Sequence, residues 1–187
     1  MMKRVFFSIN PSDEDRDFIF RILSEKKDLF PLDVVRWVRK ENIYITLLFI
    51  GLIKEDKMSN LFVAMKKAVE KIKSFTLVFD KICYHPQKGV PKLIWIKGEE
   101  SSSISFLREE LKKALVDEGL KFIEEDLLLH ITLGRIKTWE LKKMRREEIP
   151  QIEEELSFSL QVDSVFLMES ILKKGSPDYN ILNSVSL

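Results

Sequence analysis

Two short stretches of this chain carry side chains that could move a proton beside a phosphate. The stretch "LLLHITLGRIK" holds His130 and Thr132, and the stretch "NIYITLLFIGLI" holds Tyr44 and Thr46. Both are apolar, strand-like runs around I-T-L, and side chains two positions apart in a strand point to the same face. We therefore expect each pair to project together from one face of its strand.

An imidazole beside a hydroxyl suits a phosphate. The hydroxyl can donate to a non-bridging oxygen, while the imidazole transfers a proton to or from a bridging oxygen or a water. Two such pairs would flank a phosphorus atom and allow in-line displacement without a metal. One His-x-Thr alone is a weak signal, because a histidine in an apolar strand is more often a core residue. The repeated context favours the functional interpretation.

Tyrosine stands in the first stretch where histidine stands in the second. Histidine, with a pKa of about 6.5, exchanges a proton near neutrality, whereas tyrosine, at about 10, stays protonated. We expect Tyr44 to be a hydrogen-bond donor or weak acid but a poor base. The other histidine, His85, lies in "CYHPQKG", where a solvated turn residue is the default. A position near the same groove stays open for it.

The composition narrows the class of protein. With 187 residues, we expect one domain or two tightly joined lobes that fold without disulfides or a structural metal. A net charge of +1 is unlike proteins that coat long nucleic acids, so a nucleic-acid role would be local, at an end or one phosphate. Cys83 is alone, and two histidines cannot build a three-histidine zinc site, so we expect no metal.

The N-terminal stretch "MMKRVFFSINPSDED" has too short an apolar run for a signal peptide. No run of 18 apolar residues predicts a membrane span. We expect a cytoplasmic protein and a monomer.

The pattern of apolar residues predicts alternating strands and helices. Ser12 and Asp15 resemble a capping box that opens a first helix, and further helices are predicted over residues 56–72 and 103–118. The first helix is predicted to carry an apolar face made of Phe18, Ile19, Ile22 and Leu23. The first motif strand is predicted to end at Gly51.

The remaining segments predict mostly antiparallel strands. "FTLVFDKICYH" and "KLIWIKG" indicate a hairpin, and "WELKKMRREEIPQIEEEL" indicates a charged helix. The last strands, "SFSLQVDSVFLMESIL" and "DYNILNSVSL", are joined by a predicted turn, "KKGSP". We predict an α+β fold in one bilobal domain, residues 1–187, whose two similar lobes bring the motif strands to a central groove.

These motifs resemble the 2H phosphoesterases, and within them the RNA 2′,3′-cyclic phosphodiesterases once called 2′-5′ RNA ligases. The resemblance extends over nearly the whole chain, through "RVFFSINP", "VRWVRKENIYITLLFIG", "HITLGRIK" and "SVFLMES…GSPDYNIL". It implies duplicated, pseudo-twofold antiparallel sheets flanked by helices, with two His-x-Thr/Ser motifs facing a groove. It also implies hydrolysis of 2′,3′-cyclic phosphates on RNA ends to 2′-phosphomonoesters, without metal or cofactor.

Carried over residue by residue, the resemblance assigns two sets of roles. His130 and Tyr44 occupy the catalytic positions, although Tyr44 replaces the family's first histidine. Thr46, Thr132 and Arg135 occupy substrate-binding positions, with Arg135, just after T-L-G, where relatives commonly hold the phosphate.

Three functions stay open at this point. The first is an RNA 2′,3′-cyclic phosphodiesterase attenuated by Tyr44. The second is a catalytically inactive protein that binds RNA ends or nucleotides in the same groove. The third is a changed substrate, such as another cyclic or a 2′-5′-linked nucleotide. Trp37 could stack a base or simply pack against the first motif strand.

Overall fold

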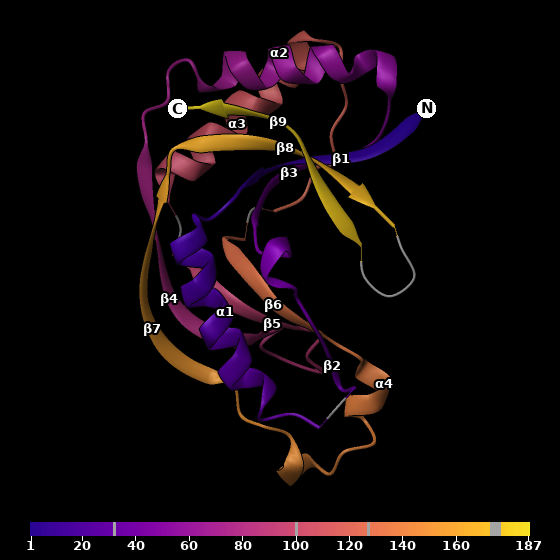
Figure 1. Cartoon of the computed structure of the whole chain (residues 1–187), viewed down its shortest axis with the longest axis vertical. Helices are drawn as coiled ribbons and strands as arrows, with labels where there is room; N and C mark the ends of the chain where they lie inside the picture. The colour runs from indigo at the N-terminus through magenta and orange to yellow at the C-terminus, as the bar shows by residue number, and fades with distance from the viewer. Residues whose placement is uncertain (32, 100, 127, 173–176) are drawn as a thin grey trace.

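Two antiparallel sheets form the frame of the molecule (Figure 1). The structure is a computed structural model that describes residues 1–31, 33–99, 101–126, 128–172 and 177–187. One sheet has the strand order β3-β1-β8-β9, and the other has the order β2-β6-β5-β4-β7. Each sheet contains one of the two I-T-L strands. The predicted α+β fold with antiparallel sheets flanked by helices is confirmed.

The smaller sheet lies in the upper part of Figure 1, with two helices covering it. Its strands are β1 (Met2–Ile9), β3 (Ile45–Lys54), β8 (Ser164–Ile171) and β9 (Asp178–Ser186). Helices α2 (Met58–Val69) and α3 (Ser102–Asp117) pack on each other and contact this sheet.

The larger sheet extends through the lower part of Figure 1, beside the first helix. Its strands are β2 (Val35–Trp37), β4 (Phe75–His85), β5 (Leu93–Gly98), β6 (His130–Ile136) and β7 (Glu153–Val162). Helix α1 (Asp13–Lys27) packs Phe18 on Phe158 of β7, with ring centroids 5.1 Å apart. Short helical turns complete the described chain: α4 (Thr138–Leu141), η1 (Lys40–Asn42), η2 (Glu55–Lys57) and η3 (Arg146–Glu148).

Several local predictions are confirmed. The Ser12 hydroxyl caps α1 by accepting a hydrogen bond from the backbone N–H of Asp15, at 3.1 Å. The two later helices lie within two or three residues of their predicted limits. The predicted hairpin is β4 and β5, in which Cys83 lies opposite Trp95.

The predicted charged helix over residues 139–156 is wrong. Only α4 and the turn η3 are helical there, and β7 already begins at Glu153. Pro150 has no backbone N–H and interrupts a helix. After it, buried Phe158 and Leu160 alternate with exposed neighbours, which is the two-residue period of a strand.

Two further strand predictions need correction. The stretch "SFSLQVDSVFLMESIL" forms two strands in different sheets, because the ladder breaks at Asp163 between β7 and β8. The first motif strand continues past Gly51, whose φ of 88° lies at a β-bulge rather than at the strand end. Glycine accommodates that left-handed conformation. Most of the predicted "KKGSP" turn lies outside the described residues.

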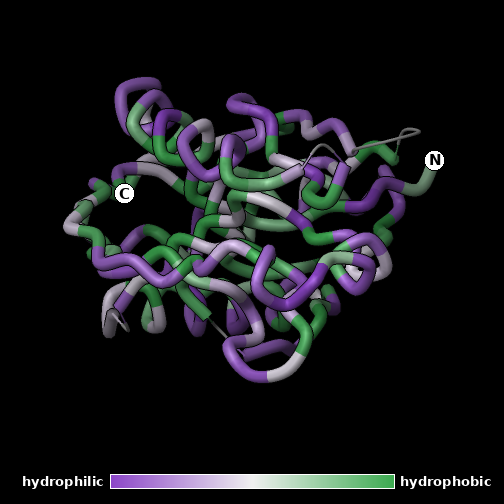
Figure 2. Tube along the Cα trace, turned by 90° about the horizontal axis from the view of Figure 1, so that it is seen from below, coloured by the Kyte–Doolittle hydropathy of each residue, from purple (hydrophilic) through white to green (hydrophobic). Residues whose placement is uncertain are grey.

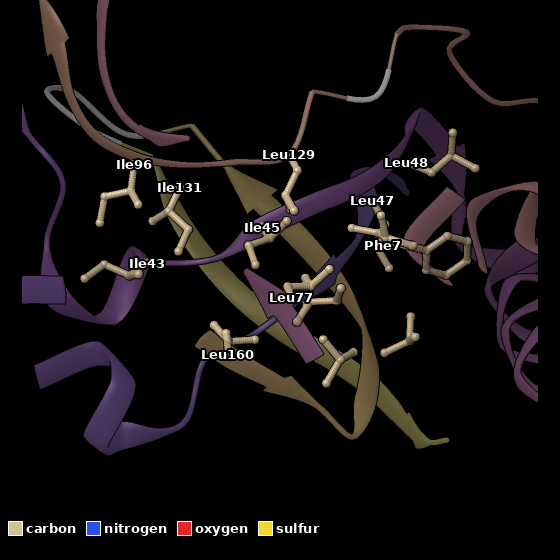
Figure 3. Packing of buried hydrophobic residues seen from close by; sticks show 14 of the residues in the cluster. Phe7, Ile43, Ile45, Leu47, Leu48, Leu77, Ile96, Leu129, Ile131 and Leu160 are labelled. Atoms are coloured by element: carbon tan, nitrogen blue, oxygen red, sulfur yellow. The ribbon is translucent and has the colours of Figure 1, made fainter. Parts of the chain in front are cut away.

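One hydrophobic core joins both sheets. The central isoleucines of the two motifs, Ile45 and Ile131, are buried in it, and Figure 3 shows them in one cluster with Ile96 and Leu129. Hydrophilic stretches gather mostly around the outside of the chain trace (Figure 2). In the described part of the chain, no helix combines the length and apolar character needed to cross a membrane.

Candidate active site

The five residues singled out from the sequence line one cavity of about 280 Å³. Thr46 of β3 and Tyr44, directly before that strand, line it on one side, and His130, Thr132 and Arg135 of β6 line it on the other. The isoleucine inside each I-T-L points instead into the core, so alternation along the strand sends the polar neighbours into the cavity. The structure thus brings the two motifs together, and the roles of the five residues stay predictions.

A β-bulge in β6 turns Arg135 toward the cavity. Trp95 lies opposite Thr132, while the residue before Trp95 pairs two positions further along β6, which leaves Leu133 as an extra residue. Strict alternation would put Arg135 on the face opposite to Thr132. The extra residue returns Arg135 to the cavity face, across from Leu93.

A β-bulge of the same kind occurs in β3. Thr46 lies opposite Ser8 of β1, and the next pairing leaves Leu47 as the extra residue. Phe49 consequently lies opposite Phe6, on the face of Thr46, and lines the cavity. Each motif strand therefore has a bulge directly after its threonine, and each presents the third residue after that threonine to the site.

His130 is held in the tautomer that a base requires. Its Nδ1–H donates to the backbone carbonyl of Leu128 at 2.6 Å, and because a carbonyl can only accept, the proton of the neutral ring is on Nδ1. Nε2 keeps its lone pair. Burial lowers the pKa of His130, and the nearby His85 and Arg135 lower it further, while the Leu128 carbonyl acts in the opposite direction.

His85 is separated from this cavity by an indole ring. The imidazole of His130 lies 3.9 Å from the Trp95 ring centroid at 17°, and that of His85 lies 3.7 Å from it at 9°. Two parallel rings so close to one centroid must occupy opposite faces of the indole. His85 lines a neighbouring cavity, which shares Trp95 with the first. The tryptophan therefore stands between His85 and the phosphate site predicted beside His130.

Tyr44 lies in an aromatic environment. Its ring centroid is 5.1 Å from that of Phe6 and 4.9 Å from that of Tyr179, which meets it edge-on. Burial raises the pKa of Tyr44 far above its ordinary value, Tyr179 raises it further, and Arg135 opposes them. The hydroxyl consequently stays protonated at any ordinary pH, as a donor that cannot act as a base.

The polar groups facing the cavity are available to an anion. Within the described ranges, neither hydroxyl of Thr46 and Thr132 has a hydrogen-bond partner, and the Arg135 guanidinium forms no ion pair. A phosphate offers acceptors for all three groups. Three donors around one cavity match a ligand with several anionic oxygens.

Arg108 of α3 is a residue that the sequence did not reveal. It is 8% exposed, and its Nε donates to the carbonyl of Leu47, the extra residue of the β3 bulge, at 3.1 Å. Its guanidinium also donates to the carbonyl of Glu125, in the segment that leads to His130. Arg108 therefore ties the two motif segments together. Its partners are main-chain carbonyls, which leave no signal in a side-chain pattern.

Trp37 packs on the second motif strand, β6, whereas the packing predicted from the sequence was on the first motif strand. Its ring is 5.8 Å from that of Phe30, and it covers Gly134, where an added Cβ would come within 3.2 Å of the indole and 2.5 Å of Val35. Trp37 also lines the cavity, so contact with a ligand stays open. Among the described residues, no three His, Cys, Asp or Glu side chains are grouped to hold a metal ion.

Comparison with protein families finds one match that spans most of the chain. The family model described as LigT like phosphoesterase matches residues 9–95 and, a second time, residues 96–179. The double match agrees with the two motif strands in two sheets. A Thermotoga maritima RNA 2′,3′-cyclic phosphodiesterase is 31% identical over 150 residues, covering 78% of this chain and 76% of the relative. One from Archaeoglobus fulgidus is 27% identical and covers 96% and 97%.

Solved structures share the fold. A protein from Thermus thermophilus superposes with a TM-score of 0.79 and 21% identity, covering 98% of this chain and 97% of its own. Escherichia coli LigT, in complex with 3′-AMP, superposes with a TM-score of 0.75 and 21% identity, covering 100% and 99%.

Proposed function

Because this chain belongs to the LigT-like phosphoesterase family, we propose that it hydrolyses 2′,3′-cyclic phosphates on RNA ends to 2′-phosphomonoesters. The observation that carries the proposal is the cavity in which a tautomer-fixed imidazole, two unpartnered hydroxyls and a guanidinium converge. The relatives named above act on the same class of bond. We further propose that the protein works as a cytoplasmic monomer.

In the proposed reaction, His130 is the general base. Its Nε2 takes a proton from water as the water oxygen bonds to phosphorus, and the bond from phosphorus to the 3′-oxygen breaks. Thr46, Thr132 and Arg135 hold the non-bridging oxygens, where charge accumulates in the transition state. The Tyr44 hydroxyl donates a hydrogen bond to the departing 3′-oxygen, which takes its proton from solvent.

Turnover in this scheme is slower than with two histidines. A general acid–base group typically contributes about 10²–10⁴-fold in rate. Tyr44, with its raised pKa, is a much weaker acid than an imidazolium, so most of one such contribution is lost. No step in the scheme is assigned to a metal or an organic cofactor.

The test is to incubate the protein with a short RNA bearing a 2′,3′-cyclic end, in EDTA, and follow its conversion to the 2′-phosphate. Conversion that the His130→Ala variant lacks supports the proposal. Formation of a 3′-phosphate instead, or equal rates in both proteins, contradicts it.

The raised pKa of Tyr44 also favours a second candidate, an RNA-end-binding protein without turnover. The three anion-binding groups need no change of protonation to hold a phosphate. Tight binding of an RNA 2′-phosphate by a protein that converts no cyclic ends would establish this alternative.

A further inference from the structure

Two arginines face each other across the edge of the larger sheet. Arg36 of β2 lies directly opposite Arg135 of β6, and both line the cavity. The neighbours of Arg36 make other contacts, since Val35 is buried in the core and Trp37, which also lines the cavity, packs on Phe30. Like charges at directly opposed positions of an antiparallel pair destabilise the sheet. An anion bound between them would remove that cost.

Protein carboxylates do not neutralise this pair. In the described part of the chain, neither Arg36 nor Arg135 forms an ion pair, although both are exposed. Arg39, which also lines the cavity, differs because its guanidinium bonds to Asp178 and lies 3.3 Å from the carboxylate of Glu41. Of these three arginines, Arg39 is paired with carboxylates, and Arg36 and Arg135 are free to bind a ligand.

The order of the strands sets the order of the charges. Along β6, His130 and Thr132 come first and Arg135 follows, and Arg36 lies one strand further from Trp95 of β5. A phosphate held beside His130 therefore lies closer along the sheet to Arg135 than to Arg36. Arg36 is in place for the next phosphate along a nucleotide chain. Gly134 allows this arrangement, because a side chain there would push against Val35 and β2.

Resting on the proposed function, we propose that Arg36 binds the phosphodiester on the 5′ side of the terminal nucleotide, with Arg135 between the two phosphates. The substrate class is then an oligonucleotide end rather than a cyclic mononucleotide. A guanidinium suits this role, because its fixed fork of donors matches two phosphate oxygens.

The experiment compares substrates that differ only at that phosphate. We would measure kcat/KM for a nucleoside 2′,3′-cyclic phosphate, the same compound with a 5′-phosphate, and a dinucleotide with the same cyclic end. The proteins are wild type, Arg36→Gln, Arg36→Lys and Arg4→Gln. The last is a control with the same charge change on an exposed β1 residue outside the cavity.

Wild type should prefer the dinucleotide by about tenfold or more, as expected for a charge-assisted hydrogen bond. Arg36→Gln should lower that preference about tenfold, Arg36→Lys should keep part of it, and Arg4→Gln should keep all of it. The KM for the dinucleotide should also rise more steeply with salt than that for the cyclic mononucleotide. Equal kcat/KM values in wild type, or an equal loss on all substrates in Arg36→Gln, would overturn the proposal.

Binding of products separates this proposal from the proposed function. Calorimetry would compare a nucleoside 2′-phosphate with a dinucleotide ending in a 2′-phosphate. If the chain hydrolyses nothing but prefers the dinucleotide through Arg36, the second phosphate site stands and the catalytic proposal fails. If hydrolysis occurs and neither measurement depends on Arg36, the second phosphate site fails alone. Absence of both binding and hydrolysis contradicts both.

Discussion

The two motif strands share a backbone design but differ in chemistry. Each passes from an aromatic or imidazole residue through I-T-L into a bulge, and then presents a third residue to the cavity. The residues presented are Thr46 and Phe49 of β3, with Tyr44 directly before that strand, and His130, Thr132 and Arg135 of β6. The threonine is kept in both, while the imidazole and the guanidinium occur in one only. In the proposed function, phosphate binding is therefore shared, and proton transfer is concentrated on the His130 side.

Burial acts alike on both sides but has opposite consequences. It lowers the pKa of His130 and raises that of Tyr44, so that each ring is favoured in its neutral form. A neutral imidazole can take a proton, whereas a neutral phenol has only a tightly held one to give. Partial burial at the cavity therefore favours the His130 side as a base and limits the Tyr44 side to hydrogen bonding.

Replacing His130 by alanine should have the largest effect. Loss of the only general base of the scheme should reduce the hydrolysis rate by about 10²–10⁴-fold or more. The matched variant in the other half, Tyr44→Phe, removes a hydroxyl while keeping the ring and should cost far less. Comparable losses in single-turnover assays of the two variants would contradict the assignment of proton transfer to one half.

Replacing Tyr44 by histidine should make the halves chemically alike. Hydrolysis should rise, within the range of about 10²–10⁴-fold for one general acid–base group. A gain near the lower end is expected, because Phe6 and Tyr179 are packed around the larger ring. The rate profile should change from a single acid limb to a bell shape. An unchanged rate in a wild type that is already fast would show that tyrosine does not limit turnover.

The threonines should be equivalent, because the two bulged strands present them alike. Thr46→Ala and Thr132→Ala should each weaken binding of a nucleotide 2′-phosphate by about 10- to 100-fold, the effect of one hydrogen bond to a charged group. Calorimetric titration of both variants and of a serine replacement at each site would measure this. Affinity that Thr132→Ala leaves untouched would argue against this cavity as the phosphate site.

The smallest predicted effect concerns the acid limb of the wild-type profile. Activity needs neutral His130, whose pKa is lowered, so activity should persist below pH 6.5, the ordinary pKa of histidine, and fall as the pH passes through the lowered value. His85 is one cause of that lowering, so His85→Gln should move the limb slightly upward. The profile of kcat/KM would show it, and a shift toward lower pH would contradict the stacked arrangement.

The sequence predicts which residues of the two motif strands belong to the site better than it predicts the direction of their side chains. The repeated I-T-L pattern is enough to bring Tyr44 and His130 to one cavity, because strand alternation sends both away from the core. Arg135 is different. Its sequence position, three residues after Thr132, predicts the opposite face of a regular strand, and only the pairing with β5 shows the bulge. A bulge arises from contacts between strands, so the local pattern does not reveal it.

Long-range contacts account for the other gaps. Arg108 bonds to carbonyls 61 and 17 positions away, and hydrogen bonds to main chain leave no trace in residue types. The charged segment before β7 favours a helix in the sequence, because its acidic and basic residues have high helix propensity. Pro150 interrupts that helix, and from Glu153 onward the pairing of β7 with the long strand β4 outweighs the local preference. The cap at Ser12 and the hairpin of β4 and β5 have local signals and are predictable, whereas the bulges and the Arg108 contacts depend on distant segments and are not.

The position of Trp95 between two imidazoles has an optical consequence. An indole in contact with a protonated imidazole loses fluorescence by electron transfer to the cation, while a neutral imidazole leaves its emission largely intact. With Trp37 and Trp139 replaced by phenylalanine, the remaining emission should come from the ring stacked on His130 and His85. The fluorescence intensity of the free protein would then measure the protonation of the two stacked imidazoles, before any substrate is added.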